Sequence, residues 1–220
     1  MHSKQNIVTI GSSSEISQCF YKQATSKDFL VHTISRTDLK TSNHLRISDY
    51  INEVEKIKLF LSNIENPIII FFNGFLAENR DFAEPTVEEI SKTDYVNYQI
   101  PYFLSKSLSE NKDIKKFIFI SSIASVRPRY KNYIYGLSKY KLEKSLRFLN
   151  LSKYLVLRFG KVETKMSSSH KSPPFTISAN KAANIILKKL DFEGLKYASF
   201  SIFISSLFVL IFPKRIIDKF

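Results

Sequence analysis

The chain is poor in the residues that form covalent or metal cross-links. It has one cysteine, no tryptophan, five glycines and two methionines among 220 residues. A lone cysteine excludes an internal disulfide, and Cys19 shares a predicted helix face with Ile16 and Phe20, so we expect a buried thiol. The four histidines show no spacing typical of metal ligands, which argues against a zinc site. We therefore expect an apolar core alone to hold the fold together.

Acidic residues are also scarce. The chain carries 33 Lys and Arg against 20 Asp and Glu, a net charge of +13. Such an excess suggests an anionic partner, either nucleic acid, a membrane surface or a phosphorylated substrate, unless the lysines serve only solubility. The basic residues are spread along the chain with no base-reading motif, so we do not expect nucleic-acid binding. The opening MHSKQNIVTI has no apolar stretch typical of a signal peptide, and we expect a cytoplasmic protein.

Short apolar runs alternate with segments of helical periodicity along the whole chain. This alternation predicts an α/β fold, a single Rossmann-like doubly wound parallel sheet with helices on both faces. In such sheets the ligand crevice lies beyond the carboxyl ends of the strands, and Gly11, Arg36, Gly74, Ser122 and Gly160 all follow predicted strands. The predicted strands are Ile7 to Ile10, Phe29 to Ile34, Ile68 to Phe72, Phe117 to Ile120 and Tyr154 to Leu157.

The stretch SSIASVRPRYKNYIYGLSKYKLEK combines a hydroxyl, a phenol and an ammonium. Tyr135 and Lys139 are four residues apart, so on a helix they share one face. A nearby ammonium favours the phenolate, and we expect Lys139 to lower the pKa of Tyr135 from its usual value of about 10. Ser122, at the end of a predicted strand, is placed to hydrogen-bond the same substrate oxygen. The three residues predict proton transfer to or from a carbonyl/alcohol pair.

This segment resembles the catalytic core of the short-chain dehydrogenase/reductase family, and the resemblance extends over almost the whole chain. It implies an NAD(P)-dependent oxidoreductase in which Ser122, Tyr135 and Lys139 are catalytic, with Lys139 also holding the nicotinamide ribose. The segment DYVNYQIPYFLSKSL resembles the family's long helix, and Asn97 there is expected to complete the proton relay through a bound water. The family usually forms homodimers or homotetramers, and we expect the same here.

The run NIVTIGSSSEIS resembles the family's phosphate-binding loop between a strand and a helix. Gly11 matches the first glycine of the loop, but Glu15 and Ser17 stand where the second and third glycines are usual. FFNGF resembles the turn beside the adenine-side ribose, and LRFGKVETKM the turn beside the nicotinamide. The cofactor-binding residues that the resemblance implies are Gly11, Ser13, Ser14, Ile16, Arg36, Asn73, Gly74, Tyr135, Lys139, Val162 and Thr164.

The residues after the second predicted strand bear on the choice of cofactor. Arg36 stands close to the position where an acidic residue binds the ribose of NAD, and a basic residue there suits the 2′-phosphate of NADP. We therefore expect NADP, with NAD as the alternative because Asp38 is near, and with an ordinary solvated charge as the other interpretation of Arg36. Only RTDLKTSNH separates this strand from the next apolar run, which predicts a loop or single turn instead of a crossover helix.

The basic loop and the apolar tail bear on the substrate. Arg127 and Arg129 lie in the loop that borders the substrate pocket in the family, and they predict an anionic substrate, unless the loop is solvated or contacts another subunit. Residues 1–196 are expected to form the dinucleotide-binding domain, and residues 197–220 an apolar extension. Its uncharged stretch, Tyr197 to Pro213, spans about 25 Å as a helix, which favours a membrane-surface anchor over a spanning helix. The alternative is that it covers the sheet or a subunit interface.

A narrower resemblance concerns the substrate class. RPRYKNYIYG, together with a tail ending in PKRIIDKF, is most similar to the family branch that contains decaprenylphosphoryl ketopentose reductases and relatives from polysaccharide biosynthesis. It implies a sugar or lipid-linked sugar substrate and a contact with the inner face of the membrane. The alternative function is a catalytically silent dinucleotide-binding scaffold or sensor. It is suggested by departures from the family pattern at Glu15 and Ser17, where glycines are usual, and at Arg46, where the family has an aspartate that contacts adenine. The presence of all four catalytic residue types favours the enzyme.

Overall fold

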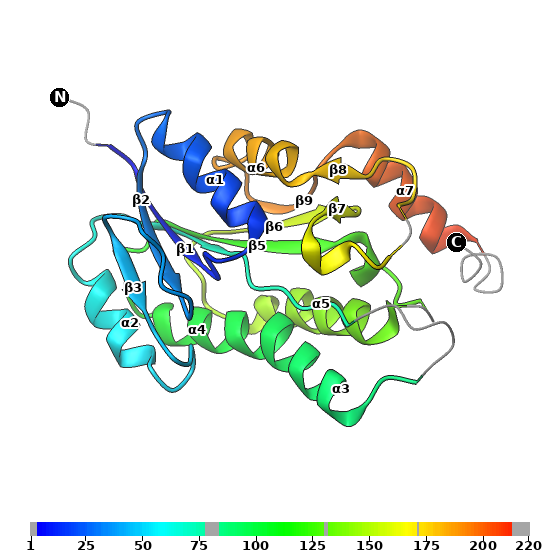
Figure 1. Cartoon of the computed structure of the whole chain (residues 1–220), viewed down its shortest axis with the longest axis horizontal. Helices are drawn as coiled ribbons and strands as arrows, with labels where there is room; N and C mark the ends of the chain where they lie inside the picture. Colours follow the sequence, from blue (N-terminus) through cyan, green and yellow to red (C-terminus); the bar gives the residue numbers. More distant parts are fainter. Residues whose placement is uncertain (1–3, 78–83, 130–131, 171, 213–220) are drawn as a thin grey trace.

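A parallel sheet of seven strands forms the centre of the molecule (Figure 1). The computed structural model describes residues 4–77, 84–129, 132–170 and 172–212. The strand order is β3-β2-β1-β4-β5-β6-β9, so the chain crosses over in opposite directions on the two sides of β1. This is the reversal at which α/β sheets leave a crevice beyond the strand ends. The strands are β1 Asn6–Ile10, β2 Leu30–Ser35, β3 His44–Arg46, β4 Ile68–Phe71, β5 Lys116–Ser122, β6 Tyr154–Phe159 and β9 Gly194–Tyr197.

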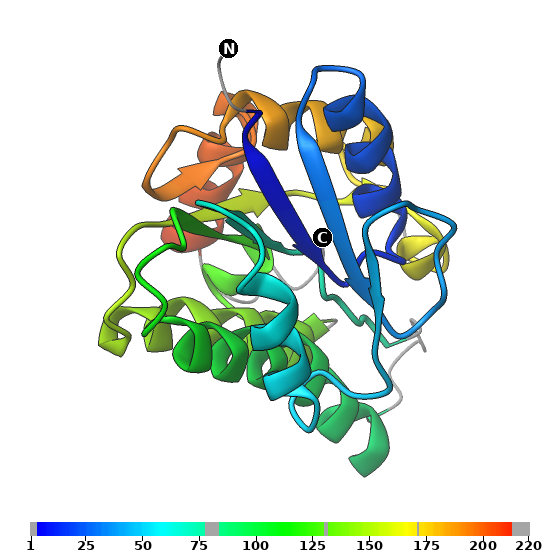
Figure 2. The same cartoon turned by 90° about the vertical axis from the view of Figure 1, so that its left-hand side faces the viewer.

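Helices cover both faces of the sheet, as the sequence predicted (Figure 2). The central strands are apolar on both sides, and all four residues of β4 are buried. Alternate residues point to opposite faces, so Ile69 and Phe71 pack in one core and Ile68 and Ile70 in the other. One layer contains α2 Val54–Leu61, α3 Val87–Asp94, α4 Ile100–Leu108 and α5 Tyr133–Ser145, and the other contains α1 Glu15–Thr25 and α6 Ala179–Lys188.

Two connections differ from a plain alternation of strands and helices. The segment between β2 and β3 contains no helix, so the predicted loop in place of a crossover helix is confirmed. A second, two-stranded pair lies beside the carboxyl end of β6, formed by β7 Val162–Glu163 and β8 Ile177–Ser178. A 3₁₀ turn, Lys165–Ser167, follows β7 and brings the chain back toward the crevice.

The apolar tail forms both a strand and a helix. Tyr197 is the last residue of β9, so the sheet extends one residue past the expected boundary at 196. After it, α7 Phe200–Ile211 begins at Ser199, whose hydroxyl caps the helix, and packs its buried residues against β9 and the turn after β5. In the part of the chain that the structure describes, no helix is long and apolar enough to cross a membrane. The basic residues predicted to follow this helix, Lys214, Arg215 and Lys219, lie outside the described residues.

Candidate active site

Ser122 stands where β5 turns into a short 3₁₀ helix, Ile123–Ser125. Its hydroxyl accepts the backbone N–H of Ala124 at 3.2 Å and caps that helix. The turn lies against α5, and a Cβ at Gly136 would come within 2.7 Å of the Ala124 carbonyl oxygen. Gly136 is therefore needed for this close approach, which places Ser122 next to the residue that precedes the glycine, Tyr135.

Tyr135 and Lys139 lie on the face of α5 that meets this turn. The Tyr135 phenol is hydrogen-bonded to the Ser122 side chain, so the predicted pair comes together. Lys139 is buried, and its Nζ donates to the carbonyl oxygen of Ile120 at 3.0 Å and to that of Asn73 at 3.4 Å. The ammonium thus links the end of β5 to the turn after β4. These contacts assemble a hydroxyl, a phenol and an ammonium at one edge of the sheet.

The predicted effect of Lys139 on Tyr135 differs from what the protein without cofactor shows. Burial raises the pKa of Tyr135 to about 12, and the hydrogen bond with Ser122 only partly opposes this. Burial also lowers the pKa of Lys139 to about 8, against the opposing charge of Glu143. Desolvation outweighs charge pairing here because Lys139 donates to two carbonyl oxygens, not to the phenol. The phenol is therefore protonated at neutral pH.

Asn97 lies at a distortion of the long helix. Residues Tyr95–Gln99 form a π-helix between α3 and α4, and Asn97 is fully buried there. Its side chain makes two bonds with the backbone of Phe75, accepting from N–H at 2.8 Å and donating to C=O at 2.7 Å. Pro101 has no N–H to donate to the Asn97 carbonyl four residues earlier. The Asn97 side chain thus fixes the turn after β4, and its backbone carbonyl lacks the usual α-helical donor.

The turn between β1 and α1 has the geometry of an anion-binding loop. Gly11 has a φ of +81°, and a Cβ there would lie 2.8 Å from the Asn73 nitrogen, so only glycine lets the turns after β1 and β4 meet. Ser14 caps α1 by accepting from the N–H of Ser17 at 3.2 Å. Ser13 is exposed and Ile16 is half-buried in the first turn of the helix. This helix start is the kind of site that attracts a phosphate.

Glu15 does not point a free charge into this turn. Its carboxylate accepts the backbone N–H of Lys165 at 2.9 Å, which joins the start of α1 to the 3₁₀ turn after β7. A cavity of about 430 Å³ lies between these segments and is lined in part by Glu15, Lys161 and Thr164. Val162 is in β7, and Thr164 caps the 3₁₀ turn. Of the predicted cofactor-binding residues, Thr164 is among those that line this cavity.

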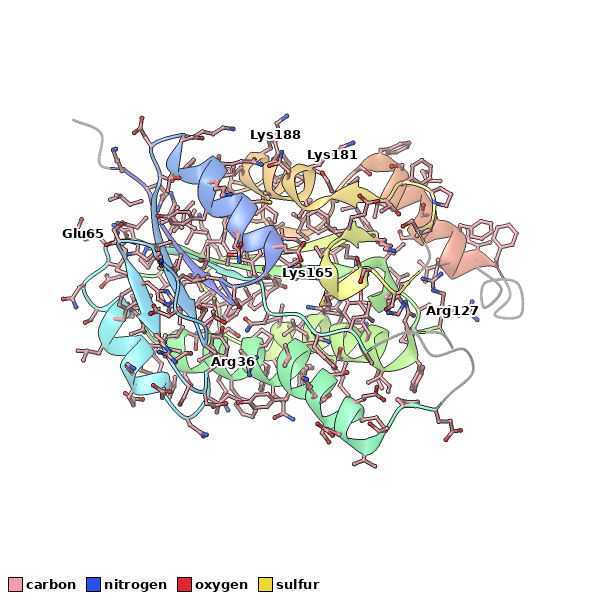
Figure 3. The ribbon with its side chains drawn as sticks, viewed as in Figure 1. Arg36, Glu65, Arg127, Lys165, Lys181 and Lys188 are labelled. Atoms are coloured by element: carbon pink, nitrogen blue, oxygen red, sulfur yellow. The ribbon has the colours of Figure 1, made fainter. Side chains whose placement is uncertain are left out.

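Arg36 is exposed and directly follows the end of β2 (Figure 3). Its charge acts on Asp49, Tyr50 and Tyr95, which lie nearby. Tyr50 is buried, its hydroxyl lies near Gly11 and Asn73, and burial raises its pKa to about 12. The Asn73 side-chain oxygen is buried without a hydrogen-bond partner, so a polar acceptor remains available beside Arg36 and Tyr50.

The two arginines of the basic loop, Arg127 and Arg129, differ in their surroundings. Arg127 donates through Nη1 to the carbonyl oxygen of Phe212 at 2.9 Å, so it holds the end of α7 (Figure 3). Arg129 follows in the same loop and is half-buried. A Cβ at Gly74 would lie 3.7 Å from the Met166 side chain, an ordinary van der Waals distance. The structure therefore places Arg127 at the tail, and the substrate contact of Arg129 stays a prediction.

Sequence reasoning missed two groups at this site. Glu143 lies one helical turn after Lys139, and it pairs with Arg158 of β6. The spacing of Tyr135, Lys139 and Glu143, four residues each, was the available signal, since such residues share a helix face. The other group is Tyr50, which only the folding of the β3–α2 segment brings to the cofactor side.

Comparisons with known proteins agree on the architecture. No protein-family model matches the chain, and no curated protein matches its sequence. Solved structures do match. A short-chain dehydrogenase from Burkholderia cenocepacia in complex with NADP aligns over 95% of this chain and 94% of its own, with a TM-score of 0.72 and 14% identity. The chain has the fold of the short-chain dehydrogenases.

Two further structures repeat this result. The ligand-free aldohexose dehydrogenase of Thermoplasma acidophilum covers 90% of this chain and 94% of its own, with a TM-score of 0.70 and 13% identity. A short-chain dehydrogenase/reductase from Vibrio parahaemolyticus covers 88% and 97%, with a TM-score of 0.70 and 18% identity. At these identities the likeness is one of fold. The short-chain dehydrogenase fold is what carries Ser122, Tyr135 and Lys139 to one edge of the sheet.

Proposed function

We propose that the protein is an NADP-dependent oxidoreductase, a ketoreductase or alcohol dehydrogenase of the short-chain type. One arrangement carries this proposal: the Tyr135 phenol is hydrogen-bonded to the Ser122 side chain, and Lys139, one helical turn after Tyr135, is buried. A buried lysine and a phenol of altered pKa beside a crevice are unusual in a purely structural role. Together they suit the transfer of one proton to or from a substrate oxygen.

The residues around the crevice fit a dinucleotide. The capped start of α1 suits a pyrophosphate, the unpaired Asn73 oxygen suits a ribose hydroxyl, and Arg36 suits a 2′-phosphate. Val162 and Thr164 are assigned to the carboxamide of the nicotinamide, and Lys139 to its ribose. When bound, such a cofactor supplies or accepts the hydride. Two of the structural neighbours have NADP bound, which is consistent with this assignment.

Tyr135 holds the proton that the reaction needs. Its phenol is neutral at pH 7, because its pKa is raised to about 12, and is therefore ready to donate to an oxygen that is gaining negative charge. Ser122 stabilises that oxygen by hydrogen bonding. Lys139 adds positive charge beneath the phenol, and the Asn97 backbone carbonyl binds the relay water. The protonated phenol is the form that the reducing direction uses, and the oxidising direction uses the phenolate.

The substrate that we propose is a sugar or lipid-linked sugar of the kind used in polysaccharide biosynthesis. Two features support a lipid-linked substrate at the inner face of the membrane. Arg129 lies in the loop after Ser122, where its positive charge would attract an anionic group. In addition, α7 exposes a row of apolar side chains, among them Phe200, Ile204 and Ile211. Apolar rows of this kind bind the interface of a bilayer.

A second candidate is the catalytically silent dinucleotide-binding scaffold. Glu15 favours it, because a carboxylate in the first turn of α1 repels a pyrophosphate unless the bond with Lys165 directs its charge away. Both candidates predict binding of NADPH. Only the enzyme predicts turnover that depends on Tyr135.

The decisive experiment is Tyr135→Phe, which removes one hydroxyl and keeps the ring. We expect turnover to fall by about 10²- to 10⁴-fold, the usual contribution of a positioned proton donor, with NADPH affinity nearly unchanged. NADPH binding is measured by thermal shift, and turnover by NADPH consumption with a panel of ketoses and lipid-linked sugars. Tyr133→Phe, which changes an exposed tyrosine on the same helix, is the matched control. If Tyr135→Phe turns over as fast as the unmodified protein, the mechanism is wrong, and NADPH binding without any Tyr135-dependent turnover favours the scaffold.

A further inference from the structure

Glu143 occupies the centre of a buried polar network behind the proposed catalytic residues. Its side chain is 8% exposed and lies on α5, one turn beyond Lys139. One carboxylate oxygen accepts from the hydroxyl of Ser121 at 2.6 Å and from that of Ser125 at 2.7 Å. These two serines stand on either side of Ser122 in the chain. The carboxylate therefore ties the turn that carries Ser122 to the helix that carries Tyr135 and Lys139.

Arg158 of β6 pairs with this carboxylate. Its Nε donates to one oxygen at 3.0 Å and its Nη2 to the other at 2.5 Å, the two-point geometry that suits guanidinium and carboxylate. Its Nη1 donates to the Tyr197 hydroxyl at 2.8 Å. Three donors of a side chain that is 14% exposed are thus satisfied. Both carboxylate oxygens of Glu143 thus have a guanidinium donor in the interior, where an unpaired charge is costly.

The charged and titratable groups around Lys139 are few in the described part of the chain. Tyr135 and Glu143 come from α5 itself, and Arg158 comes from β6, where it pairs with Glu143. The turns after β4 and β5 present only the neutral carbonyls of Asn73 and Ile120. Farther along α5, Lys141 pairs with Asp94 at 2.7 Å. The Glu143 carboxylate is therefore the anion that can favour the charged form of Lys139.

We propose that Glu143 is a positioning residue for the proposed reaction: it fixes the Ser122 turn against α5 and supplies the negative charge that keeps Lys139 protonated. This inference rests on the proposed function in one respect only, the role of Lys139 beside the cofactor and the phenol. The geometry itself gives two consequences. Loss of the charge destabilises the ammonium, while loss of a single serine bond loosens the turn without changing the charge.

The test is Glu143→Gln, which keeps the shape and an acceptor oxygen but removes the charge. Because the carboxylate opposes the burial that lowers the pKa of Lys139, its removal should move the titration midpoint of Lys139 further down, by about one pH unit. The midpoint is read by NMR of lysine-labelled protein without cofactor, with Lys139→Met identifying the signal. The pH above which NADPH affinity declines should fall in parallel. Ser125→Ala, which removes one bond to Glu143 and no charge, should leave the midpoint unchanged.

A merely structural role gives a different result. In that case Glu143→Gln lowers the melting temperature while Lys139 titrates as in the unmodified protein, and the proposal is overturned. Glu143→Asp keeps the charge and should retain most of the Lys139 midpoint, so it tests the same point if the glutamine variant does not fold. A midpoint that falls as far with Glu143→Asp as with Glu143→Gln also overturns the proposal. The Lys139 midpoint is measured on the protein without cofactor. If the unmodified chain fails to bind NADPH, that separate result overturns the proposed function and leaves the midpoint test intact.

Discussion

At the scale of single residues, the site depends on how burial changes ordinary acid–base behaviour. The spacing of Tyr135 and Lys139 predicted one shared helix face, because a helix brings residues four apart together, and both residues lie on α5. Their protonation was not predicted correctly, because desolvation depends on which backbone carbonyls and side chains surround each group. That information comes from the packing of α5 against the turn after β5. Glu143 illustrates the same limit, since its partners Ser121, Ser125 and Arg158 come from β5, the 3₁₀ helix after it and β6.

Arg36 gives a residue-scale prediction about cofactor choice. Arg36→Ala should weaken NADPH binding by about 1.5 to 3 kcal/mol, the usual contribution of a charge-assisted hydrogen bond, and should change NADH binding little. Calorimetric titrations with NADPH and with NADH measure the difference in binding free energy. Lys40→Ala removes an exposed positive charge from the same loop and is the matched control for long-range attraction. Equal losses for NADPH and NADH would mean that Arg36 does not contact the 2′-phosphate.

At the scale of elements, the meeting of two turns shapes the proposed phosphate site. Gly11 after β1 and Asn73 after β4 approach so closely that a Cβ has no room. The sequence indicated the strands and the glycine, because apolar runs and a strand–glycine–helix pattern are local signals. The π-helix at Tyr95–Gln99 has no such signal, apart from the missing N–H of Pro101. The bond from Glu15 to Lys165 joins residues 150 positions apart, and nothing local predicts it.

Gly11→Ala should separate the effect of this close approach from that of backbone conformation. Gly11 and Gly194 both have positive φ, +81° and +72°, but a Cβ at Gly194 meets nothing within 4 Å. Gly194→Ala should therefore cost only the backbone strain, about 1 to 2 kcal/mol of unfolding free energy. Gly11→Ala should cost about 1 to 3 kcal/mol more, because the turns must move apart. Urea denaturation of both variants measures the difference, and equal losses would show that the two turns adjust freely.

At the scale of the whole molecule, the central sheet was predictable and the role of the tail was not. Five of the strands coincide with apolar runs seen in the sequence, since buried parallel strands need apolar residues on both faces. The tail has the same apolar character, yet it divides into an edge strand and a helix. Tyr197 ends β9, which pairs with β6, and its hydroxyl accepts from Arg158, while Ile202 of α7 packs against Gly160. Self-association, which the sequence predicts, stays a prediction, with exposed Phe103 of α4 and Tyr140 of α5 as places to test it.

The outer face of α7 carries the last prediction. Phe200, Ile204 and Ile211 lie four and seven residues apart, so they share one helix face, and they are 76%, 47% and 76% exposed. If this face enters a bilayer interface, each side chain contributes about 1.5 kcal/mol or more, roughly tenfold in affinity. Changing all three to Gln should therefore abolish binding to vesicles, measured by sedimentation with anionic and neutral lipid.

Two results decide this prediction. Leu59→Gln and Phe148→Gln alter exposed apolar residues away from α7, at 71% and 86% exposure, and should leave binding intact. Binding of the unmodified protein should be stronger on anionic lipid, because a basic residue near the surface adds about 1 kcal/mol and Arg127 holds the end of this helix. If the unmodified protein ignores both kinds of vesicle, and the triple variant changes only its oligomeric state, then α7 is a subunit contact. A lipid-linked substrate would then lose its main support.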